Sequence, residues 1–473
     1  MNIRKALKKL KLLILTLTWV GSSAQSPELW GITNYGGSNS LGTLYKIKGD
    51  GSGFAVVHTF TASPTGEYPN WSLLQVRQSG SLYGMAAYGG TYASGVIFKI
   101  DTLSYSYCVV HDFNDTAGAI PFGDLMQAGN GLLYGITHSG SGGYGEFFSL
   151  DPVTSSFTAI HNFSSSDGEY SMGTPAEASN GKIYGATTNG AANGLGAIYC
   201  YDPTTNIFNK IYDLTTSGGT YPFGEKLLSA SNGLIYGLMG AGGANNGGTI
   251  FSFDVSTNIY TKLFDFSNST GSAPGGSLIQ ATNGLLYGMT FKQGANGGGT
   301  IFSFNLSGNI FTKLYDFTSL NGKNPLGSLM QASDGNLYGV TDSGGVSNMG
   351  VVFKFAIPLN SYTKIFDFNG INGQTDQGGL IELKSLGNGI REEQGNSLLI
   401  YPNPANNSLN LHFSNADMIG KEVSLHDISG AIVLKQKIYS TSQPLNISEL
   451  SPGTYFLNYL FKGQSVNKKI VIR

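Results

Sequence analysis

An aromatic residue followed by glycine recurs along the chain at a nearly constant interval, and this period constrains the fold more than any other feature. Successive copies are 53, 51, 50, 52, 51 and 51 residues apart. They begin at Trp30, Tyr83, Tyr134, Tyr184, Tyr236, Tyr287 and Tyr338. A fixed period of about 50 residues is typical of solenoids and propellers, in which each unit buries its apolar face against its neighbour. The sequence therefore predicts seven equivalent units.

Each unit contains four segments with the composition of short β-strands. A first strand such as GSLMQA (327–332) is followed by a polar hairpin and a second strand such as LYGVT (337–341). GTIFSFD (248–254) and YTKLFDF (260–266) exemplify the third and fourth strands. The 68 glycines and the 12% of aromatic residues suit short strands joined by tight turns. We expect type I′ turns, with positive φ at both central residues, at Asn130-Gly131, Asn180-Gly181, Asn232-Gly233 and Asn283-Gly284.

The first strand of the first unit is missing before Trp30 and reappears in phase at the other end of the array. This segment is GGLIEL, Gly378 to Leu383, and its Leu380 follows Leu329 by 51 residues. Pairing of this strand with the Trp30 strand would close the array into a ring. We therefore predict an all-β fold with a seven-bladed β-propeller over residues 25–385. The alternatives are an open β-solenoid or two stacked sandwiches, but a β-helix coil would be shorter than 50 residues.

The ends of the chain and its charge indicate an exported protein. Residues 1–24 have a basic start and a short apolar core, as in a signal peptide cleaved between Ala24 and Gln25. No apolar run reaches about 18 residues, so no transmembrane segment is expected. Residues 25–396 contain 15 Lys and Arg against 25 Asp and Glu, a net of −10, which argues against nucleic acid as a partner. Cys108 and Cys200 are expected to be buried thiols.

Residue types that carry chemistry are present, but their repetition favours structural roles. His58, His111 and His161 share one repeat position with Tyr and Phe in other units, which predicts packing. The recurrent aspartate of the fourth strand is predicted to be a hydrogen-bond acceptor. Its copies are Asp112, Asp213, Asp265, Asp316 and Asp367. No metal-binding, phosphate-binding or nucleophile motif is found, so no metal, cofactor or catalytic residue is assigned.

The loops of one propeller face are the candidate binding surface. Connections from the second to the third strand, and from the fourth strand to the next unit, share this face, and they are rich in aromatic residues. The candidate ligand-binding residues are Tyr35, Tyr68, Tyr88, Tyr92, Phe122, His138, Tyr144, Tyr170, Tyr221 and Phe291. We expect a non-catalytic module that binds a glycan or an extracellular protein. A polysaccharide-active enzyme using carboxylates of the same face, and a purely structural surface-layer role, are the alternatives.

The composition changes after a polar linker at 386–397. Residues 398–473 carry alternating strands separated by Asn, Gly and Pro turns, which predicts a small Ig-like β-sandwich. An Ig-like adhesive module is one interpretation of this segment.

Two resemblances add to this interpretation. Residues 29–383 resemble the GloVer tandem repeat, through LYGVT (337–341), Gly344-Gly345 and GVVF (350–353). The tail resembles the type A C-terminal sorting domain of the type IX secretion system of Bacteroidetes. Its matching residues include Tyr401, Pro402, Asn403, Pro404, Gly453, Tyr455, Lys468 and Lys469. That resemblance implies type IX machinery as partner, passage through the periplasm and across the outer membrane, tail removal, and release or attachment to lipopolysaccharide.

Overall fold

The structure, a computed structural model, is built from β-strands. It describes residues 26–61, 63–114, 118–140, 142–222, 226–374, 378–384, 398–401, 405, 407–413, 418–461 and 464–472. Within these ranges every assigned element is a strand except one 3-10 turn, η1 (Ile357–Leu359). The predicted signal peptide with Ala24 and Gln25, the linker 386–397, and Pro402, Asn403 and Pro404 lie outside the described residues.

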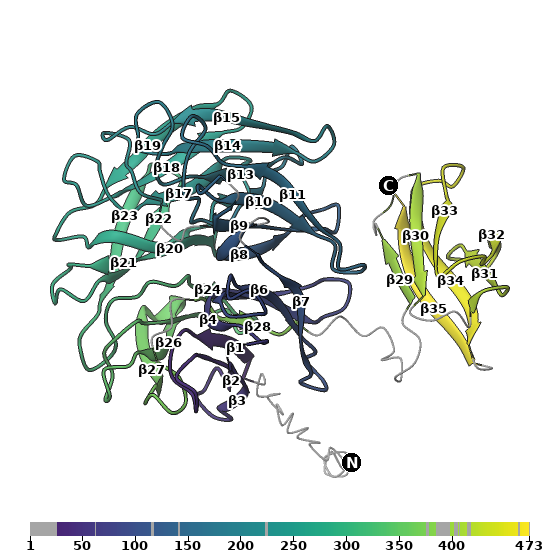
Figure 1. The fold of residues 1–473 in the computed structure, drawn as a ribbon, viewed down its shortest axis with the longest axis horizontal. Coiled ribbons are helices and arrows are strands. Elements are labelled where there is room, and N and C mark those ends of the chain that lie inside the picture. The colour runs from purple at the N-terminus through teal and green to yellow at the C-terminus, as the bar shows by residue number, and fades with distance from the viewer. Residues whose placement is uncertain are drawn as a thin grey trace, which may run out of the picture.

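Seven four-stranded antiparallel sheets account for the strands between residues 28 and 382 (Figure 1). Sheet 1 contains β1 (Glu28–Thr33), β2 (Thr43–Lys48), β3 (Ala55–Thr59) and β28 (Ile381–Glu382). Sheet 2 contains β4 (Glu67–Gln75), β5 (Leu82–Tyr88), β6 (Val96–Ile100) and β7 (Tyr107–Asp112). Sheet 3 contains β8 (Ala119–Gln127), β9 (Leu133–Ser139), β10 (Glu146–Leu150) and β11 (Phe157–Asn162).

The remaining sheets of this series follow the same order. Sheet 4 contains β12 (Ala176–Glu177), β13 (Ile183–Ala186), β14 (Ala197–Asp202) and β15 (Ile207–Asp213). Sheet 5 contains β16 (Leu228–Ser229), β17 (Ile235–Met239), β18 (Thr249–Asp254) and β19 (Ile259–Asp265). Sheet 6 contains β20 (Ser272–Gln280), β21 (Leu286–Lys292), β22 (Thr300–Asn305) and β23 (Ile310–Asp316). Sheet 7 contains β24 (Met330–Gln331), β25 (Leu337–Val340), β26 (Val351–Ala356) and β27 (Ser361–Asp367).

Sheet 1 is assembled from both ends of the repeat array. Strand β28 pairs with β1, with Trp30 opposite Ile381 and Leu29 opposite Glu382. The predicted pairing of the orphan strand with the Trp30 strand is therefore present. The same segment also contacts sheet 2, because the Gly379 N–H donates to Ser72 Oγ at 2.7 Å. These bonds tie residues about 300 positions apart in sequence.

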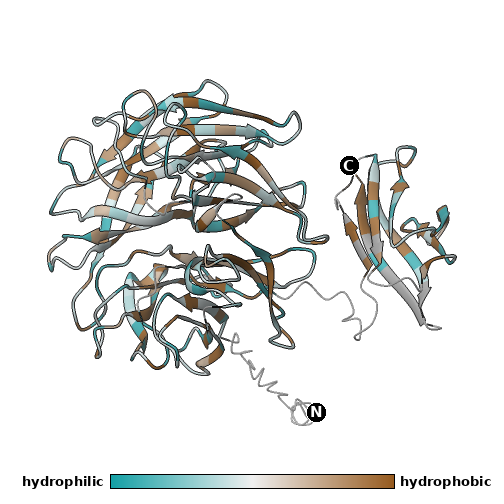
Figure 2. Cartoon of the chain, viewed as in Figure 1, coloured by the Kyte–Doolittle hydropathy of each residue, from teal (hydrophilic) through white to brown (hydrophobic). Residues whose placement is uncertain are grey.

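Apolar residues on the strands form a separate core at each junction between sheets (Figure 2). Sheets 1 and 2 share a cluster that includes Trp30 and Phe98, and later clusters join each sheet to the next. Sheet 7 packs back on sheet 1, where Tyr338 and Leu380 belong to one cluster. Each sheet thus covers both of its faces with neighbouring sheets, which removes apolar surface from water without helices.

The glycine of the aromatic-glycine motif is required by packing. A Cβ on Gly288 would lie 2.6 Å from the ring of Phe302, which comes from the adjacent third strand and crosses over the glycine. Gly339 has the same relation to Phe353. This explains why Tyr-Gly and Gly-x-Ile/Val-Phe recur together, since the ring can lie flat only over a residue without a side chain.

The hairpin turns differ from the predicted type I′ geometry. In the Asn-Gly turns only the glycine has a positive φ, for example 90° at Gly131. The asparagine keeps an ordinary backbone and uses its side chain instead: Asn130 Nδ2 donates to the hydroxyl of Tyr134, and Asn130 Oδ1 accepts from the Leu132 N–H. The same pair of bonds recurs at Asn180, Asn232 and Asn283. The turn therefore fixes the tyrosine of the repeat motif.

Parallel ring stacks connect the fourth strands of adjacent sheets. His58 stacks on Tyr107 with centroids 4.0 Å apart, and His161 on Phe208 at 3.7 Å. The other pairs are His111–Phe157, Tyr212–Tyr260, Phe264–Phe311, Tyr315–Tyr362 and Phe366–Phe54. The prediction that these histidines pack is confirmed. The last pair joins sheet 7 to sheet 1, so every junction has one stack.

The expectation of two buried thiols is wrong for one of them. Cys200 is buried, but Cys108 is exposed. Cys108 lies on β7, whose outward-facing residues meet solvent because a fourth strand is the outer edge of its sheet.

The tail forms two further sheets around its own core. One contains β29 (Leu398–Tyr401), β30 (Ser408–Phe413) and β33 (Ser442–Asn446). The other contains β31 (Glu422–His426), β32 (Ile432–Lys437), β34 (Gly453–Phe461) and β35 (Gln464–Ile472). All buried residues of the core cluster, such as Leu411 and Leu457, come from the tail itself.

Candidate functional site

The long connections of sheets 1 to 7 meet on one face, which we call the loop face. It comprises the segments between second and third strands and those leading from each fourth strand to the next sheet. Backbone bonds join the two kinds of segment: the Tyr68 N–H donates to the Leu41 carbonyl, and the Tyr170 N–H donates to the Tyr144 carbonyl. The topology thus brings together the segments that carry the ten predicted ligand-binding residues.

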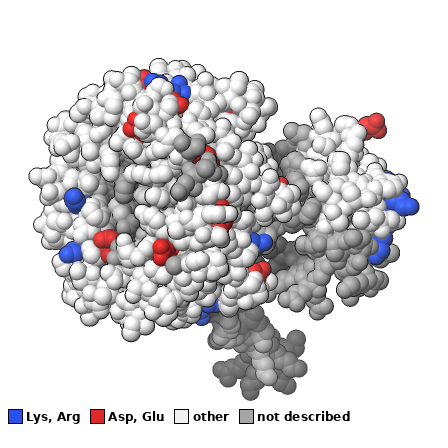
Figure 3. Space-filling view, in the orientation of Figure 1, with Lys and Arg blue, Asp and Glu red and all other residues white. Residues whose placement is uncertain are grey.

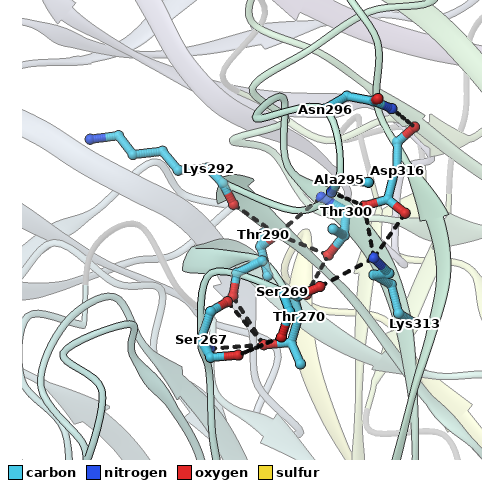
Figure 4. Close-up of polar contacts among 11 residues, drawn as sticks. Ser267, Ser269, Thr270, Thr290, Lys292, Ala295, Asn296, Thr300, Lys313 and Asp316 are labelled. Atoms are coloured by element: carbon cyan, nitrogen blue, oxygen red, sulfur yellow. Dashed lines mark hydrogen bonds and ion pairs between the residues drawn. The ribbon is translucent and has the colours of Figure 1, made fainter.

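A recurrent aspartate holds these loops in place (Figure 4). Asp316 Oδ1 accepts from the Ala295 N–H at 2.6 Å, and its carboxylate pairs with Lys313 at 2.9 Å. Lys313 Nζ also donates to the Ser269 carbonyl at 3.1 Å. Equivalent loop bonds are made by Asp112, Asp213, Asp265 and Asp367. The predicted structural role of this aspartate is confirmed.

Three of the predicted tyrosines form one aromatic run. Tyr68 lies between Tyr35, at a centroid distance of 5.2 Å, and Tyr88, at 6.1 Å. Tyr35 is 44% exposed and Tyr88 is 42% exposed, so much of each ring faces solvent. Rings at these distances attract one another through offset or edge contacts and hold each other in place. We call Tyr35, Tyr68 and Tyr88 run one.

A second run contains four predicted residues and one tryptophan. Phe122 contacts Trp71 at 5.2 Å and His138 at 6.2 Å, and His138 stacks on Tyr170 at 4.8 Å, which in turn contacts Tyr144 at 6.2 Å. Burial lowers the pKa of His138, which favours the neutral form of the ring in this stack. We call these five residues run two. Strand β4 links the runs, because it carries both Tyr68 and Trp71.

The other three predicted residues lie outside both runs. Tyr92 is 60% exposed and Tyr221 is 44% exposed, each on its own loop. Phe291 is half-buried beneath Lys292, whose Nζ lies 5.7 Å from the ring centroid. Seven of the ten predicted residues therefore belong to the two runs, and Tyr92, Tyr221 and Phe291 belong to neither.

A cavity of about 910 Å³ lies among the first strands and is lined by none of the ten predicted residues. Two sets of hydrogen bonds link neighbouring first strands around it. In one, the Ser72 N–H donates to Asp124 and the Ser277 N–H to Ser328 Oγ. In the other, the Thr282 N–H donates to Gln331 Oε1 and the Lys384 N–H to Gln75 Oε1. These side chains use their hydrogen bonds to join neighbouring first strands.

Sequence reasoning missed one buried carboxyl group. Glu146 begins β10 and is 1% exposed, and its Oε1 has no hydrogen-bond partner among the described residues. Burial raises its pKa to about 7. Other units place Thr43, Thr249 or Thr300 at this repeat position, so alignment of the units would have singled it out. Burial also raises the pKa of Asp124 in the cavity and of Asp342 near Lys323.

The predicted sorting residues that are described lie on the tail strands. Tyr401 ends β29, Gly453 begins β34, and Lys468 and Lys469 lie on β35. Tyr455 is buried in the tail core and its hydroxyl donates to the Ser451 carbonyl at 2.8 Å.

Two family models match the sequence. The Gloeobacter/Verrucomicrobia repeat model matches residues 18–176, 137–292 and 174–399. The chain belongs to the Gloeobacter/Verrucomicrobia repeat family. The secretion system C-terminal sorting domain model matches residues 399–473 of this Gloeobacter/Verrucomicrobia repeat protein. The tail is therefore a type IX sorting domain, which implies type IX secretion machinery as its partner and export across the outer membrane to the cell surface or the medium.

Similar folds occur among solved structures at low sequence identity. A putative 6-phosphogluconolactonase from Bacteroides fragilis matches with a TM-score of 0.52 and 14% identity, over 76% of this chain and 98% of that one. One from Bacteroides uniformis matches with 0.50 and 14%, over 72% and 95%. TolB from Acinetobacter baumannii matches with 0.39 and 14%, over 61% of this chain and 63% of its own length. At such identity the first two similarities concern the fold alone. No curated protein matches this repeat protein.

None of the helices among the described residues has the length and apolar character needed to cross a bilayer.

Proposed function

We propose that residues 25–385 form a seven-bladed β-propeller that binds a glycan or an extracellular protein without catalysis, after a signal peptide (1–24) and the sorting domain (398–473) have exported it. The observation that carries the binding role is the pair of aromatic runs on the loop face. Exposed tyrosines at interfaces combine a large apolar area with a hydrogen-bonding hydroxyl, which suits both ligands.

The circular packing of the sheets supports the propeller. Each core cluster spans two consecutive sheets, and the cluster of Tyr338 and Leu380 returns to sheet 1. Strand β28 would then fasten the ring by completing the first blade. The tail, with its two sheets and one core, fits a small Ig-like sandwich, and removal of this tail would leave the propeller released or attached to lipopolysaccharide.

Hydrogen bonding of the carboxylates favours a binding role over a catalytic one. Glu177 accepts from the Gly129 N–H, and Glu382 from the Ser333 N–H, so the acidic groups of the cavity link neighbouring sheets. The test is binding of the purified full-length chain to glycan arrays and to extracellular proteins in pull-down assays. Turnover of a polysaccharide by a homogeneous preparation would overturn the non-catalytic proposal.

Glu146 favours the second candidate, a polysaccharide-active enzyme. A general acid needs a pKa near the working pH, and burial raises the pKa of Glu146 to about 7. Because Tyr144 of run two lies two residues away, a glycan on the loop face would approach this segment. Loss of polysaccharide cleavage in Glu146→Gln, with unchanged binding, would establish this candidate, whereas equal cleavage by both proteins would reject it.

A further inference from the structure

Three tyrosines of the loop face occupy a backbone position that disfavours tyrosine. Tyr68 is the second residue of β4, Tyr170 and Tyr221 occupy the equivalent position ahead of β12 and β16, and their φ angles are 51°, 53° and 61°. This left-handed region brings Cβ close to the following carbonyl oxygen, and only Gly, Asn and Asp visit it readily.

The backbone at this position does not depend on tyrosine. In sheets 6 and 7 the equivalent residues are Ala273, with φ of 49°, and Asn324, with φ of 57°. Their N–H groups donate to Gly247 and Gly298, as the Tyr68 N–H does to Leu41. A small residue at this position therefore makes the same backbone hydrogen bond as tyrosine does. A strained residue that the fold does not require indicates a role for its side chain outside folding.

Two of these tyrosines each contact two other members of an aromatic run. Tyr68 contacts both Tyr35 and Tyr88, and Tyr170 contacts both His138 and Tyr144. Tyr221, on the connection to sheet 5, keeps 44% of its surface exposed. The strained position thus presents aromatic rings on the connections to sheets 2, 4 and 5, whereas Ile120, with φ of 54°, occupies it on the connection to sheet 3.

The charge of the loop-face connections indicates which class of ligand they can bind. The connections over sheets 1 to 4 are residues 34–42, 60–71, 87–95, 113–124, 138–145, 163–174, 187–196 and 214–225. They contain neither Lys nor Arg, and their described acidic residues outside the cavity are Glu67, Asp167 and Glu169. Sulfate, phosphate or uronate groups would meet carboxylates and find no cation. Lys, Arg, Asp and Glu side chains are scattered over the face of the molecule that is seen in Figure 3.

We infer that the loop face over sheets 1 to 4 is a stacking surface for an extended, neutral glycan, with sugar rings on Tyr68, Tyr170 and Tyr221. This inference rests on the proposed binding function and specifies its ligand. The flat apolar side of a sugar ring covers a tyrosine, while its hydroxyls bond with the Asn, Ser and Thr side chains of the same loops. The acidic groups would also attract a basic protein segment. The test distinguishes binding of such a segment from binding of a glycan.

The test compares variants at one repeat position. Tyr68, Tyr170 and Tyr221 are each replaced by Asn, singly and together, and Ala273→Asn is the matched control. Affinity electrophoresis of the full-length chain uses gels with neutral polysaccharides (dextran, yeast mannan, xyloglucan) or acidic ones (alginate, polygalacturonate). Thermal unfolding of every variant is measured in parallel.

The expected result is retardation by at least one neutral polysaccharide and by no acidic one. The triple variant should lose about tenfold or more in affinity, with an unchanged or raised Tm, and Ala273→Asn should bind as the parent. Retardation by the acidic gels, or full binding by the triple variant, would overturn the inference. Binding of an extracellular protein or poly-lysine, but of no polysaccharide, would overturn it while leaving the proposed function intact. Absence of all binding would reject both.

Discussion

His58 lies flat against Tyr107, with ring centroids 4.0 Å apart and planes inclined by 1°. His111 has the same relation to Phe157. In sheets 5 and 7 the equivalent residues are Phe264 and Phe366, which cannot be charged. His161 stacks on Phe208 in the same way, so three junctions between adjacent sheets contain a histidine, whereas those of Phe264 and Phe366 contain only hydrocarbon rings.

His58 and His111 predict acid sensitivity. Burial lowers the pKa of both below the ordinary value of 6.5, and for His111 the nearby Asp112 partly opposes the shift. The folded state then binds fewer protons than the unfolded state, so stability is full above about pH 6.5 and falls as the pH drops below it. His58→Phe with His111→Phe should weaken the fall of Tm between pH 7 and 5, by about 2–4 °C for each 1–2 kcal/mol recovered. Parallel Tm profiles for parent and variant would contradict this.

The pairing of β28 with β1 predicts that deleting residues 378–383 destabilises the fold far more than deleting an equal length of linker. Their removal deletes the partner of β1 and the buried Leu380, which is 3% exposed. Leu380→Ala alone should cost about 2–5 kcal/mol in the free energy of unfolding. Deletion of six residues within 386–397 is the control and should leave the urea midpoint unchanged. If both deletions unfolded alike, closure would play no part in stability.

The aspartate of Figure 4 should be replaceable without loss of binding. Asp316→Ala removes the acceptor of the Ala295 N–H and the partner of Lys313. The expected cost is about 1–2 kcal/mol, because a hydrogen bond to a charged group is lost where the Asp316 side chain is 23% exposed. Asp316→Asn should cost less, since unit 3 has Asn162 at this position. A variant with unchanged urea unfolding but no ligand binding would show that this aspartate contacts the ligand.

Truncation of the sorting domain should separate export from folding. Deleting residues 398–473 should leave the sheets of residues 28–382 folded, because no residue of the tail core belongs to their clusters. The shortened chain should accumulate in the periplasm, since the predicted signal peptide would carry it only across the inner membrane. Fractionation of the native host and limited proteolysis measure the two outcomes. Equal secretion of both chains would contradict the sorting role, and degradation of the truncated chain would contradict independent folding.

The sequence by itself determined the repeat, the order of strands and the partner of the first strand. Leu380 occupies the same repeat position as Leu329. This position is enough to predict the pairing of its strand, because strands of equivalent units must bury equivalent residues. It also placed the tyrosines on one face, since antiparallel order decides at which end each connection lies. The localisation of the protein follows from short linear motifs of the tail. The secretion machinery recognises these motifs with little dependence on the rest of the chain.

Only the tertiary structure decided which of those residues touch. Run two joins Trp71, Phe122 and Tyr170 from separate units, and their contacts depend on how adjacent sheets are placed. The burial of Glu146 and the exposure of Cys108 likewise depend on which strand covers them. The left-handed backbone of Tyr68 arises from a hydrogen bond to Leu41, in the preceding sheet. Local sequence encodes strands and turns, whereas contacts between units are set by packing that no single unit contains.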